Sequence, residues 1–309
     1  MNLENKKATR QSYGEALAKL GEKNKNIVVL DADLAEATKT SIFAKQFPNR
    51  FFDMGIAEQD MLSTAAGMST CDKIPYVSTF AVFAAGRAYD QIRSSICYPN
   101  LNVKICATHA GITVGEDGAT HQMLEDINLM RGMPNMTVVC PSDDIQTKWV
   151  IEEISKIKGP VYVRLARLAT PVIYEESQKF ELGKGIQIGD GTDATVFATG
   201  ITVSAALEAK DILEKQGINI RVVDIHTIKP IDKELIIKCA KETKKIITIE
   251  DHSIIGGLGS AICEVLSDEY PSRVTRLGMK DIFGKSGKAE ELLKYFGLTK
   301  EAIIEEVKK

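Results

Sequence analysis

Residues 103–122 read VKICATHAGITVGEDGATHQ. The first five residues form a mostly apolar run that is typical of a buried strand. The glycine-rich segment after it carries two of the chain's four histidines, His109 and His121. A loop that leaves the carboxyl end of a strand in an α/β sheet is where ligands bind. We therefore expect an α/β fold with a ligand site at this loop.

On both sides of this segment, short apolar runs alternate with stretches of helical period. The pattern predicts strands at 27–30, 51–54, 75–78, 103–107, 137–140 and 161–165, then at 194–198, 220–223 and 245–249. It predicts helices at 12–20, 57–69, 79–96, 124–130, 142–157, 203–215, 232–241 and 260–266. Strands that alternate with helices indicate mostly parallel sheets covered by helices on both faces.

The alternation is interrupted once, by a polar and irregular segment around 171–185. Such a segment is typical of a linker between domains. We expect two α/β domains, at 1–172 and 187–309, joined by a linker at 173–186.

Composition narrows the class of protein. The net charge is −3 and no run of five like charges occurs, which disfavours binding to nucleic acids or membrane surfaces. No apolar run approaches the roughly 20 residues that a membrane helix needs. The six cysteines stand singly, as in a reduced compartment. These features favour a soluble cytoplasmic protein.

Glu58 opens a predicted helix and shares one face with Leu62 and Ala65, at spacings of four and seven residues. In the ordinary interpretation it is a solvated acid that is favourable in the first turn of a helix. If it is buried instead, its charged form is disfavoured and it suits proton exchange near neutral pH.

Phe80 and Phe83 are one helical turn apart. Such a pair belongs to the core in most proteins, but it can also provide a stacking surface for a flat heteroaromatic ring. An acid such as Glu58 beside this pair would suit a nitrogen heterocycle.

His109 and His121 border a loop with three glycines, which lets the backbone approach a ligand closely. Asp117 precedes His121 by four residues, a spacing that permits a carboxylate–imidazole pair. A metal site is disfavoured because no third cysteine or histidine lies at ligand spacing. His226 and His252 have no such loop and are interpreted as structural or interface residues.

Three arginines are candidates for holding a phosphate, because a guanidinium group matches phosphate geometry. Arg164 and Arg167 follow a predicted strand, and Arg10 begins a helix. Ordinary surface ion pairs are the alternative interpretation.

Two glycine motifs are weak. Gly189-Asp190-Gly191 followed by Asn219 has the spacing of a metal–diphosphate motif, but the flanking extended arms favour a hairpin turn. Residues 256–260, GGLGS, depart from a dinucleotide loop at the final glycine.

Four segments together resemble one family. They are Gly55-Ile56-Ala57-Glu58-Gln59, Thr79-Phe80 with Phe83, Thr108-His109 with Gly115 to Gln122, and Asp31-Ala32-Asp33-Leu34. With these motifs the chain is similar, along essentially its whole length, to the C-terminal half of transketolase. The resemblance implies a pyrimidine-binding domain followed by the C-terminal domain of that family.

The resemblance also implies a cofactor, thiamine diphosphate. In such an enzyme Glu58 would protonate the aminopyrimidine ring, and the cofactor would act as an electron sink for the carbon chemistry. Phe80 and Phe83 would pack the pyrimidine, Ile56 would support the bent cofactor, and Asp33 would lie near the thiazolium.

The implied activity is transfer of a two-carbon ketol unit from a ketose phosphate to an aldose phosphate. Asp117 and His121 would meet the sugar hydroxyls, with His121 and Glu58 as the catalytic pair. His109, Arg10 and Arg167 would bind donor or acceptor near its phosphate.

The sequence departs from the family in three ways. The diphosphate-binding domain that precedes this half in full-length transketolases is absent, and Ala37 and Gly86 replace a phosphate-binding serine and a third stacking aromatic. The resemblance therefore implies one subunit of a split enzyme. An N-terminal partner would supply the ligands of Mg²⁺ or Ca²⁺, in an α2β2 heterotetramer.

Two other functions remain open. Half of a deoxyxylulose phosphate synthase or a 2-oxo-acid dehydrogenase β subunit would be built on similar domains, and residues 86–91, GRAYDQ, resemble the synthase. A scaffold without catalytic activity that stabilises a partner is the alternative from another class, although the intact Glu58 argues against it.

Overall fold

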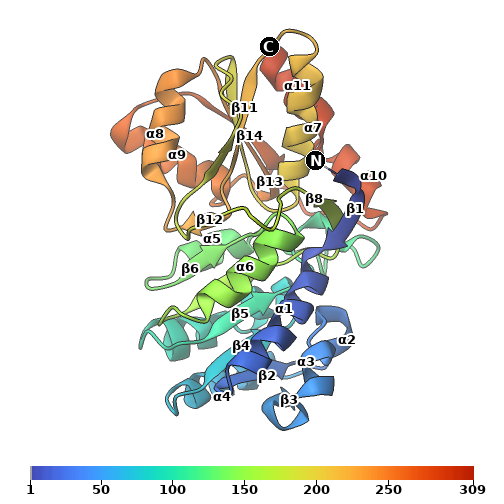
Figure 1. Ribbon diagram of the computed structural model, residues 1–309, viewed down its shortest axis with the longest axis vertical. Helices are drawn as coiled ribbons and strands as arrows, with labels where there is room; N and C mark the ends of the chain where they lie inside the picture. The colour runs from blue at the N-terminus through green and yellow to red at the C-terminus, as the bar shows by residue number, and fades with distance from the viewer. Residues whose placement is uncertain (1) are drawn as a thin grey trace.

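The computed structural model describes residues 2–309, with side chains from residue 5. Two α/β units are stacked along the long axis of the molecule, and each has a mostly parallel sheet between helices (Figure 1). This arrangement confirms the expected fold class. None of the helices within the described residues has the length and apolar character that a membrane crossing requires.

The first sheet has seven strands in the order β12-β6-β7-β5-β4-β2-β3. Its strands are β2 (Ile27–Asp31), β3 (Phe51–Asp53), β4 (Ile74–Ser78), β5 (Lys104–Ala107), β6 (Thr137–Val139), β7 (Val161–Arg164) and β12 (Thr227–Lys229). The first six are parallel, whereas β12 comes from the second half of the chain and pairs antiparallel with β6. The second half therefore completes the edge of the first sheet.

Helices cover both faces of this sheet. They are α1 (Thr9–Lys23), α2 (Ala35–Thr38), α3 (Ser41–Gln46), α4 (Glu58–Ser69), α5 (Asp126–Arg131) and α6 (Asp144–Ile154), with short 3-10 turns at Pro48–Arg50 and Ile112–Val114. One core contains Leu17, Phe43 and Val150 from α1, α3 and α6. The other contains Met61 and Ile127 from α4 and α5.

The single helix predicted after β4 is instead two π-helical segments, η2 (Val82–Arg87) and η3 (Gln91–Cys97). The amide of Ala88 donates to the carbonyl of Phe83, five residues back. π-Helical turns are rare and occur frequently at functional sites.

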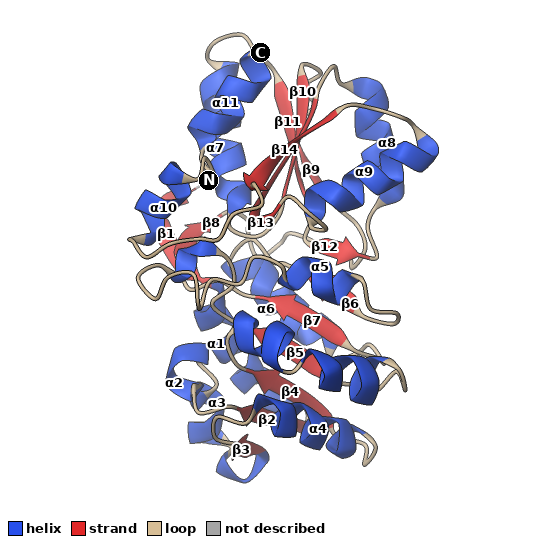
Figure 2. Ribbon diagram, turned by 180° about the vertical axis from the view of Figure 1, so that it is seen from behind, coloured by secondary structure: helices blue, strands red, loops and turns tan. Residues whose placement is uncertain are grey.

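The second sheet has the order β14-β13-β10-β11-β9, with β9 antiparallel. Its strands are β9 (Ile186–Ile188), β10 (Ala194–Ala198), β11 (Ile220–Asp224), β13 (Ile246–Ser253) and β14 (Val274–Met279). Figure 2 shows α7 and α11 on one face and α8 and α9 on the other. The helices are α7 (Thr202–Glu214), α8 (Lys233–Glu242), α9 (Leu258–Glu269), α10 (Ala289–Tyr295) and α11 (Lys300–Lys308).

The prediction of a hairpin around Gly189-Asp190-Gly191 is wrong. β9 pairs with β11, which lies between β9 and β10, so the turn crosses beneath the start of β11. A Cβ on Gly191 would lie 2.3 Å from the carbonyl oxygen of Asn219, so the crossing requires a glycine. These residues lie at the amino ends of β10 and β11, the edge opposite to that where ligands usually bind.

Besides the pairing of β12 with β6, two features lie at the seam between the halves. The short strands β1 (Asn2–Ala8) and β8 (Ala169–Val172) form an antiparallel ribbon beside α10 (Figure 1). At the centre of the seam, Nε of Arg164 lies 2.8 Å from Oδ2 of Asp126, and Nη2 donates to the carbonyl of Asp251 at 2.8 Å. All three residues are buried. Arg164 is thus a structural residue at the interface of the halves, and is not available for a phosphate.

Candidate functional site

Glu58 begins α4 directly after the loop that leaves β3. Its side chain is only 1% exposed, and Leu62 and Ala65 on the same helical face are fully buried. The face predicted from the spacing is therefore buried, and the carboxylate lies within the protein. Ile56, two residues earlier, is 75% exposed, which is unusual for a large apolar side chain.

The partner of Glu58 is Arg87. Nη1 of Arg87 lies 2.9 Å from Oε1 and 2.8 Å from Oε2 of Glu58. The guanidinium carbon of Arg87 lies 4.4 Å from the centre of the Phe83 ring, over its face. Sequence reasoning did not select Arg87 as a site residue. The available signal was its position four residues after Phe83, which places both side chains on one face of the helical segment.

The aromatic pair forms a stack. The rings of Phe80 and Phe83 are 5.9 Å apart and nearly parallel, at 10°. The other neighbour of Phe80 is the imidazole of His109, with ring centres 3.8 Å apart, and the rings of His121 and Phe83 make a T-shaped contact with centres 5.7 Å apart. The structure therefore brings the predicted acid, both phenylalanines and both histidines into one continuous set of contacts.

His109 is held as a neutral imidazole. Nη1 of Arg10 donates to Nε2 of His109 at 3.0 Å, and an arginine can only donate. The ring proton must then be on Nδ1, which contacts the hydroxyl of Thr108 at 2.8 Å. Burial, reinforced by the charges of Arg10 and Arg167, lowers the pKa of His109 to about 3. The backbone of His109 has φ of +57°, a left-handed conformation that is uncommon for residues other than glycine.

The two arginines predicted for phosphate binding flank this histidine. Arg10 also donates to the backbone carbonyl of Ala37 at 2.9 Å. Arg167 donates to the carbonyl of Val114 and lies 3.6 Å from Glu116. The backbone amide of Arg10 lies 3.4 Å from the carbonyl oxygen of Ala166, the neighbour of Arg167, so the two arginines are close. Burial and then the charge of Arg167 lower the pKa of Arg10.

The spacing of Asp117 and His121 permits a carboxylate–imidazole pair. Within residues 2–309 these two side chains form no such pair. Nδ1 of His121 contacts the hydroxyl of Thr120 at 2.9 Å, and Asp117 is exposed. Gly118 has φ of +74°, and the turn it makes separates the two side chains along the loop. Both remain free to meet a ligand.

Asp33 lies just after the carboxyl end of β2 and is exposed, with φ of +61°. Its amide donates to Oδ1 of Asp53 at 3.1 Å, which fixes the turn. The neighbouring Asp31 is buried and accepts from the hydroxyls of Thr38 and Thr40. Asp33 therefore carries the free carboxylate at this strand end.

The remaining two histidines are structural, as predicted. His226 is buried and packs against the rings of Trp149 and Phe180. His252 is buried at the seam, 4.0 Å from Asp126. No group of three or more histidine, cysteine, aspartate or glutamate residues within 2–309 is arranged to hold a metal ion.

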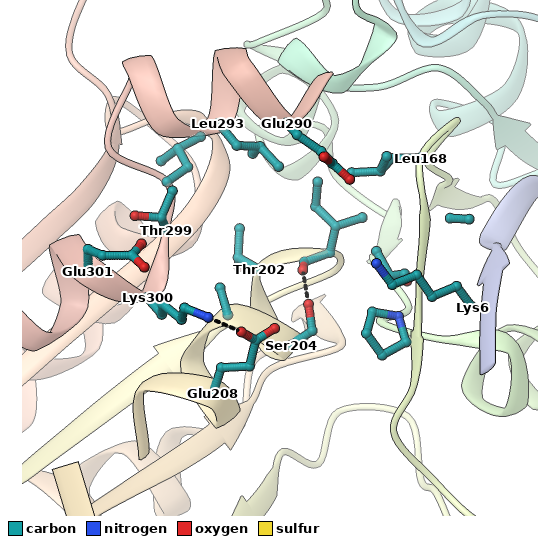
Figure 3. Close-up of a pocket in the computed structure, with 16 residues that line it drawn as sticks. Lys6, Leu168, Thr202, Ser204, Glu208, Glu290, Leu293, Thr299, Lys300 and Glu301 are labelled. Atoms are coloured by element: carbon teal, nitrogen blue, oxygen red, sulfur yellow. Dashed lines mark hydrogen bonds and ion pairs between the residues drawn. The ribbon is translucent and has the colours of Figure 1, made fainter. Parts of the chain in front are cut away.

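A separate cavity of about 360 Å³ lies at the seam, lined by residues of the β1–β8 ribbon and of α7, α10 and α11 (Figure 3). An ion pair between Lys300 and Glu208, 2.6 Å long, forms part of its wall. It contains none of the residues predicted for the site, so it is distinct from the region around Glu58.

Comparison with known proteins gives the family. Residues 5–172 match the transketolase pyrimidine-binding domain and residues 183–303 match the transketolase C-terminal domain. A protein from Methanocaldococcus jannaschii, named provisionally as a transketolase C-terminal section, is 54% identical over 98% of this chain and 97% of its own length. Rat transketolase is 41% identical over 97% of this chain but only 48% of its own length.

Comparison with solved structures points to the same family. A structure described as a split-gene transketolase in an inactive β4 tetramer has a TM-score of 0.89 and 51% identity, and the match covers 97% of both chains. A Pichia stipitis transketolase in complex with sedoheptulose 7-phosphate has a TM-score of 0.81 and 26% identity, over 98% of this chain and 45% of that one. This chain belongs to the transketolase family and has the pyrimidine-binding and C-terminal domains of that family.

Proposed function

We propose that this chain is the C-terminal subunit of a transketolase. It would transfer a two-carbon ketol unit from a ketose phosphate to an aldose phosphate with thiamine diphosphate. The observation that carries the proposal is the buried carboxylate of Glu58 beside the Phe80–Phe83 stack, in a chain of this family. An acid and a ring surface are what an aminopyrimidine needs for proton exchange and stacking.

The residues present fit the pyrimidine half of the cofactor. When bound, thiamine diphosphate supplies a carbon centre that accepts and stabilises the electron pair of the cleaved bond. Glu58 would hold and move a proton at the ring nitrogen N1′, and Phe80 and Phe83 would fix the plane of the ring. Ile56, 75% exposed, would support the bent cofactor once a partner covers it. Asp33 would lie near the thiazolium.

The substrate would bind on the other side of the Phe80–Phe83 stack. Arg10 and Arg167 provide two positive charges beside His109, which suits a phosphate. Because His109 is neutral, it would act there as a hydrogen-bonding group and not as a third cation. Asp117 and His121, on the glycine loop, would orient the sugar hydroxyls.

The site would be complete only with a partner. We infer that an N-terminal subunit holds the diphosphate through Mg²⁺ or Ca²⁺, in an α2β2 heterotetramer. A 51% identical split-gene relative whose β chains assemble alone is described as inactive, which supports a site shared between different subunits. A 40% identical relative from Clostridium is named a 6-deoxy-6-sulfo-D-fructose transketolase subunit, so anionic sugars other than phosphates deserve testing as substrates.

Calorimetry tests the proposal. We expect the isolated chain to bind thiamine diphosphate weakly and to be inactive, and the complex with the N-terminal subunit to bind it tightly with Mg²⁺. Ketol transfer from xylulose 5-phosphate to ribose 5-phosphate should appear only in the complex. Tight magnesium-dependent binding by the isolated chain, or a complex with no transfer activity towards any anionic sugar, would contradict the proposal.

A further inference from the structure

The glycine loop that carries Asp117 and His121 belongs to the first domain but rests on the second. Asp251, at the end of β13, accepts from the amide of Ile112 at 3.0 Å and from the hydroxyl of Thr113 at 3.4 Å. The side chain of Ile112 packs in a small core whose other members include Met279, Leu292 and Leu298. The first half of the loop is therefore anchored to the C-terminal domain.

The second half of the loop is covered by residues 284–287, which we call the covering segment. Nε2 of Gln122 donates to the carbonyl of Lys285 at 2.9 Å and reaches the carbonyls of Ile112 and Gly115 at 3.2 and 3.3 Å. The hydroxyl of Ser286 donates to the carbonyl of Glu116 at 2.5 Å. Gln122, only 4% exposed, thus links both ends of the glycine loop to the other domain.

The fit between loop and covering segment leaves little space. A Cβ added to Gly284 would lie 1.9 Å from Oε1 of Gln122, and one added to Gly115 would lie 3.4 Å from the carbonyl oxygen of Gly287. Gly284 has an ordinary φ, so an alanine there would act on Gln122 by steric contact and not through backbone strain.

We propose that the C-terminal domain sets the conformation of the glycine loop, with Gln122 as a positioning residue and the covering segment as its support. This inference rests on the proposed function, since the loop matters for activity only if Asp117 and His121 meet the sugar. It assigns the second domain a role in substrate affinity, although none of the predicted site residues lies in it.

The first test is kinetic and uses the complex with the N-terminal subunit. Gly284→Ala displaces the carboxamide of Gln122, and Ser286→Ala removes one exposed hydroxyl that donates to the loop. Each should raise the KM for the donor sugar phosphate by about fivefold, the effect of one lost hydrogen bond, while kcat and the affinity for thiamine diphosphate stay within about twofold. Lys280→Ala, an exposed change four residues before the covering segment, is the control.

The second test is hydrogen–deuterium exchange, which needs no activity. In Gly284→Ala and Ser286→Ala the amides of residues 111–122 should exchange faster than in the parent chain, and in Lys280→Ala they should not. If Gly284→Ala does not fold, Ser286→Ala still tests whether the covering segment positions the glycine loop, because its change is confined to an exposed side chain.

The outcomes separate the two proposals. A parent complex without ketol transfer overturns the proposed function, and with it the role in substrate affinity, while exchange still tests whether the segment holds the loop. An active complex in which both variants keep the parent KM and exchange pattern overturns this inference alone. Loss of kcat or thermal stability with an unchanged KM also overturns it, since that pattern indicates only a structural role.

Discussion

Both carboxylate oxygens of Glu58 lie within 2.9 Å of a single nitrogen of Arg87, Nη1. The same guanidinium covers the face of Phe83. The guanidinium group of Arg87 thus stacks on the ring of Phe83 and donates to the carboxylate of Glu58. An aminopyrimidine would need the same ring face and the same carboxylate. A pyrimidine that is to meet Glu58 must therefore displace Arg87, whose side chain is 44% exposed and free to turn away.

Replacing Arg87 with Gln should tighten the binding of thiamine diphosphate to the complex. Displacing a hydrogen bond between charged groups costs about 1.5 kcal/mol, so the expected gain is about tenfold in Kd, measured by calorimetry. Arg93→Gln makes the same charge change at an exposed position on η3 and should leave Kd unchanged. Weaker binding in Arg87→Gln would show that Arg87 assists the cofactor and does not compete with it.

Glu58→Gln should abolish proton exchange at C2 of the cofactor in the complex while assembly stays intact. The amide keeps the shape of the side chain but cannot hold the proton, and loss of such a group typically costs at least about 100-fold in rate. Exchange is followed by proton NMR, and assembly by analytical ultracentrifugation. Asp60→Asn, an exposed acid in the same first turn, is the control. Exchange near the parent rate would remove Glu58 from the mechanism.

His226 should make the chain less stable in acid. Burial lowers the pKa of His226 to about 4 in the folded state, from 6.5 in its absence. The unfolded chain therefore takes up this proton at higher pH than the folded chain, and stability is lost as pH falls from 6.5 towards 4. Relative to His226→Gln, the parent should lose up to about 3 kcal/mol across this window.

Urea unfolding of both proteins at about pH 7.5 and about pH 4.5 measures this difference. The comparison with the variant is essential because burial raises the pKa values of Glu250 to about 7 and Asp224 to about 6, which opposes the effect of His226 in the parent. A difference in stability that does not change with pH would contradict the assignment.

Local patterns in the sequence were enough for the α/β class and for the helical face that Glu58 shares with Leu62 and Ala65, because strand alternation and helical spacing act over a few residues. They left open whether Glu58 is solvated or buried, since a carboxylate is also favourable in the exposed first turn of a helix. The placement of His109 against Phe80 required parallel strands β4 and β5 to bring their carboxyl ends together. Pairing of β9 with β11, and of β12 with β6, depends on contacts distant in sequence, so the hairpin prediction failed. Arg87 was missed because its spacing from Phe83 places both side chains on one helical face but does not specify where a long exposed side chain points.

Arg164 and Asp126 provide the last prediction, because their pair lies at the centre of the seam. Asp126 is fully buried and also accepts from the hydroxyl of Tyr162 at 2.8 Å. Arg164→Met would leave this carboxylate without its cation, which costs about 3–5 kcal/mol of unfolding free energy. In the double variant with Asp126→Asn the uncompensated charge is absent. The loss of unfolding free energy should therefore be smaller than in Arg164→Met alone.

Urea unfolding of the parent, both single variants and the double variant forms a complete cycle. Lys23→Met, which breaks the exposed pair with Glu152, is the control and should change stability by no more than about 0.5 kcal/mol. If Arg164→Met were no more destabilising than this control, Arg164, whose Nη2 also donates to the carbonyl of Asp251 in the second domain, would not stabilise the seam measurably. Contact between the domains would then depend on other interactions, such as the pairing of β12 with β6 and the hydrogen bond from the amide of Ile112 to Asp251.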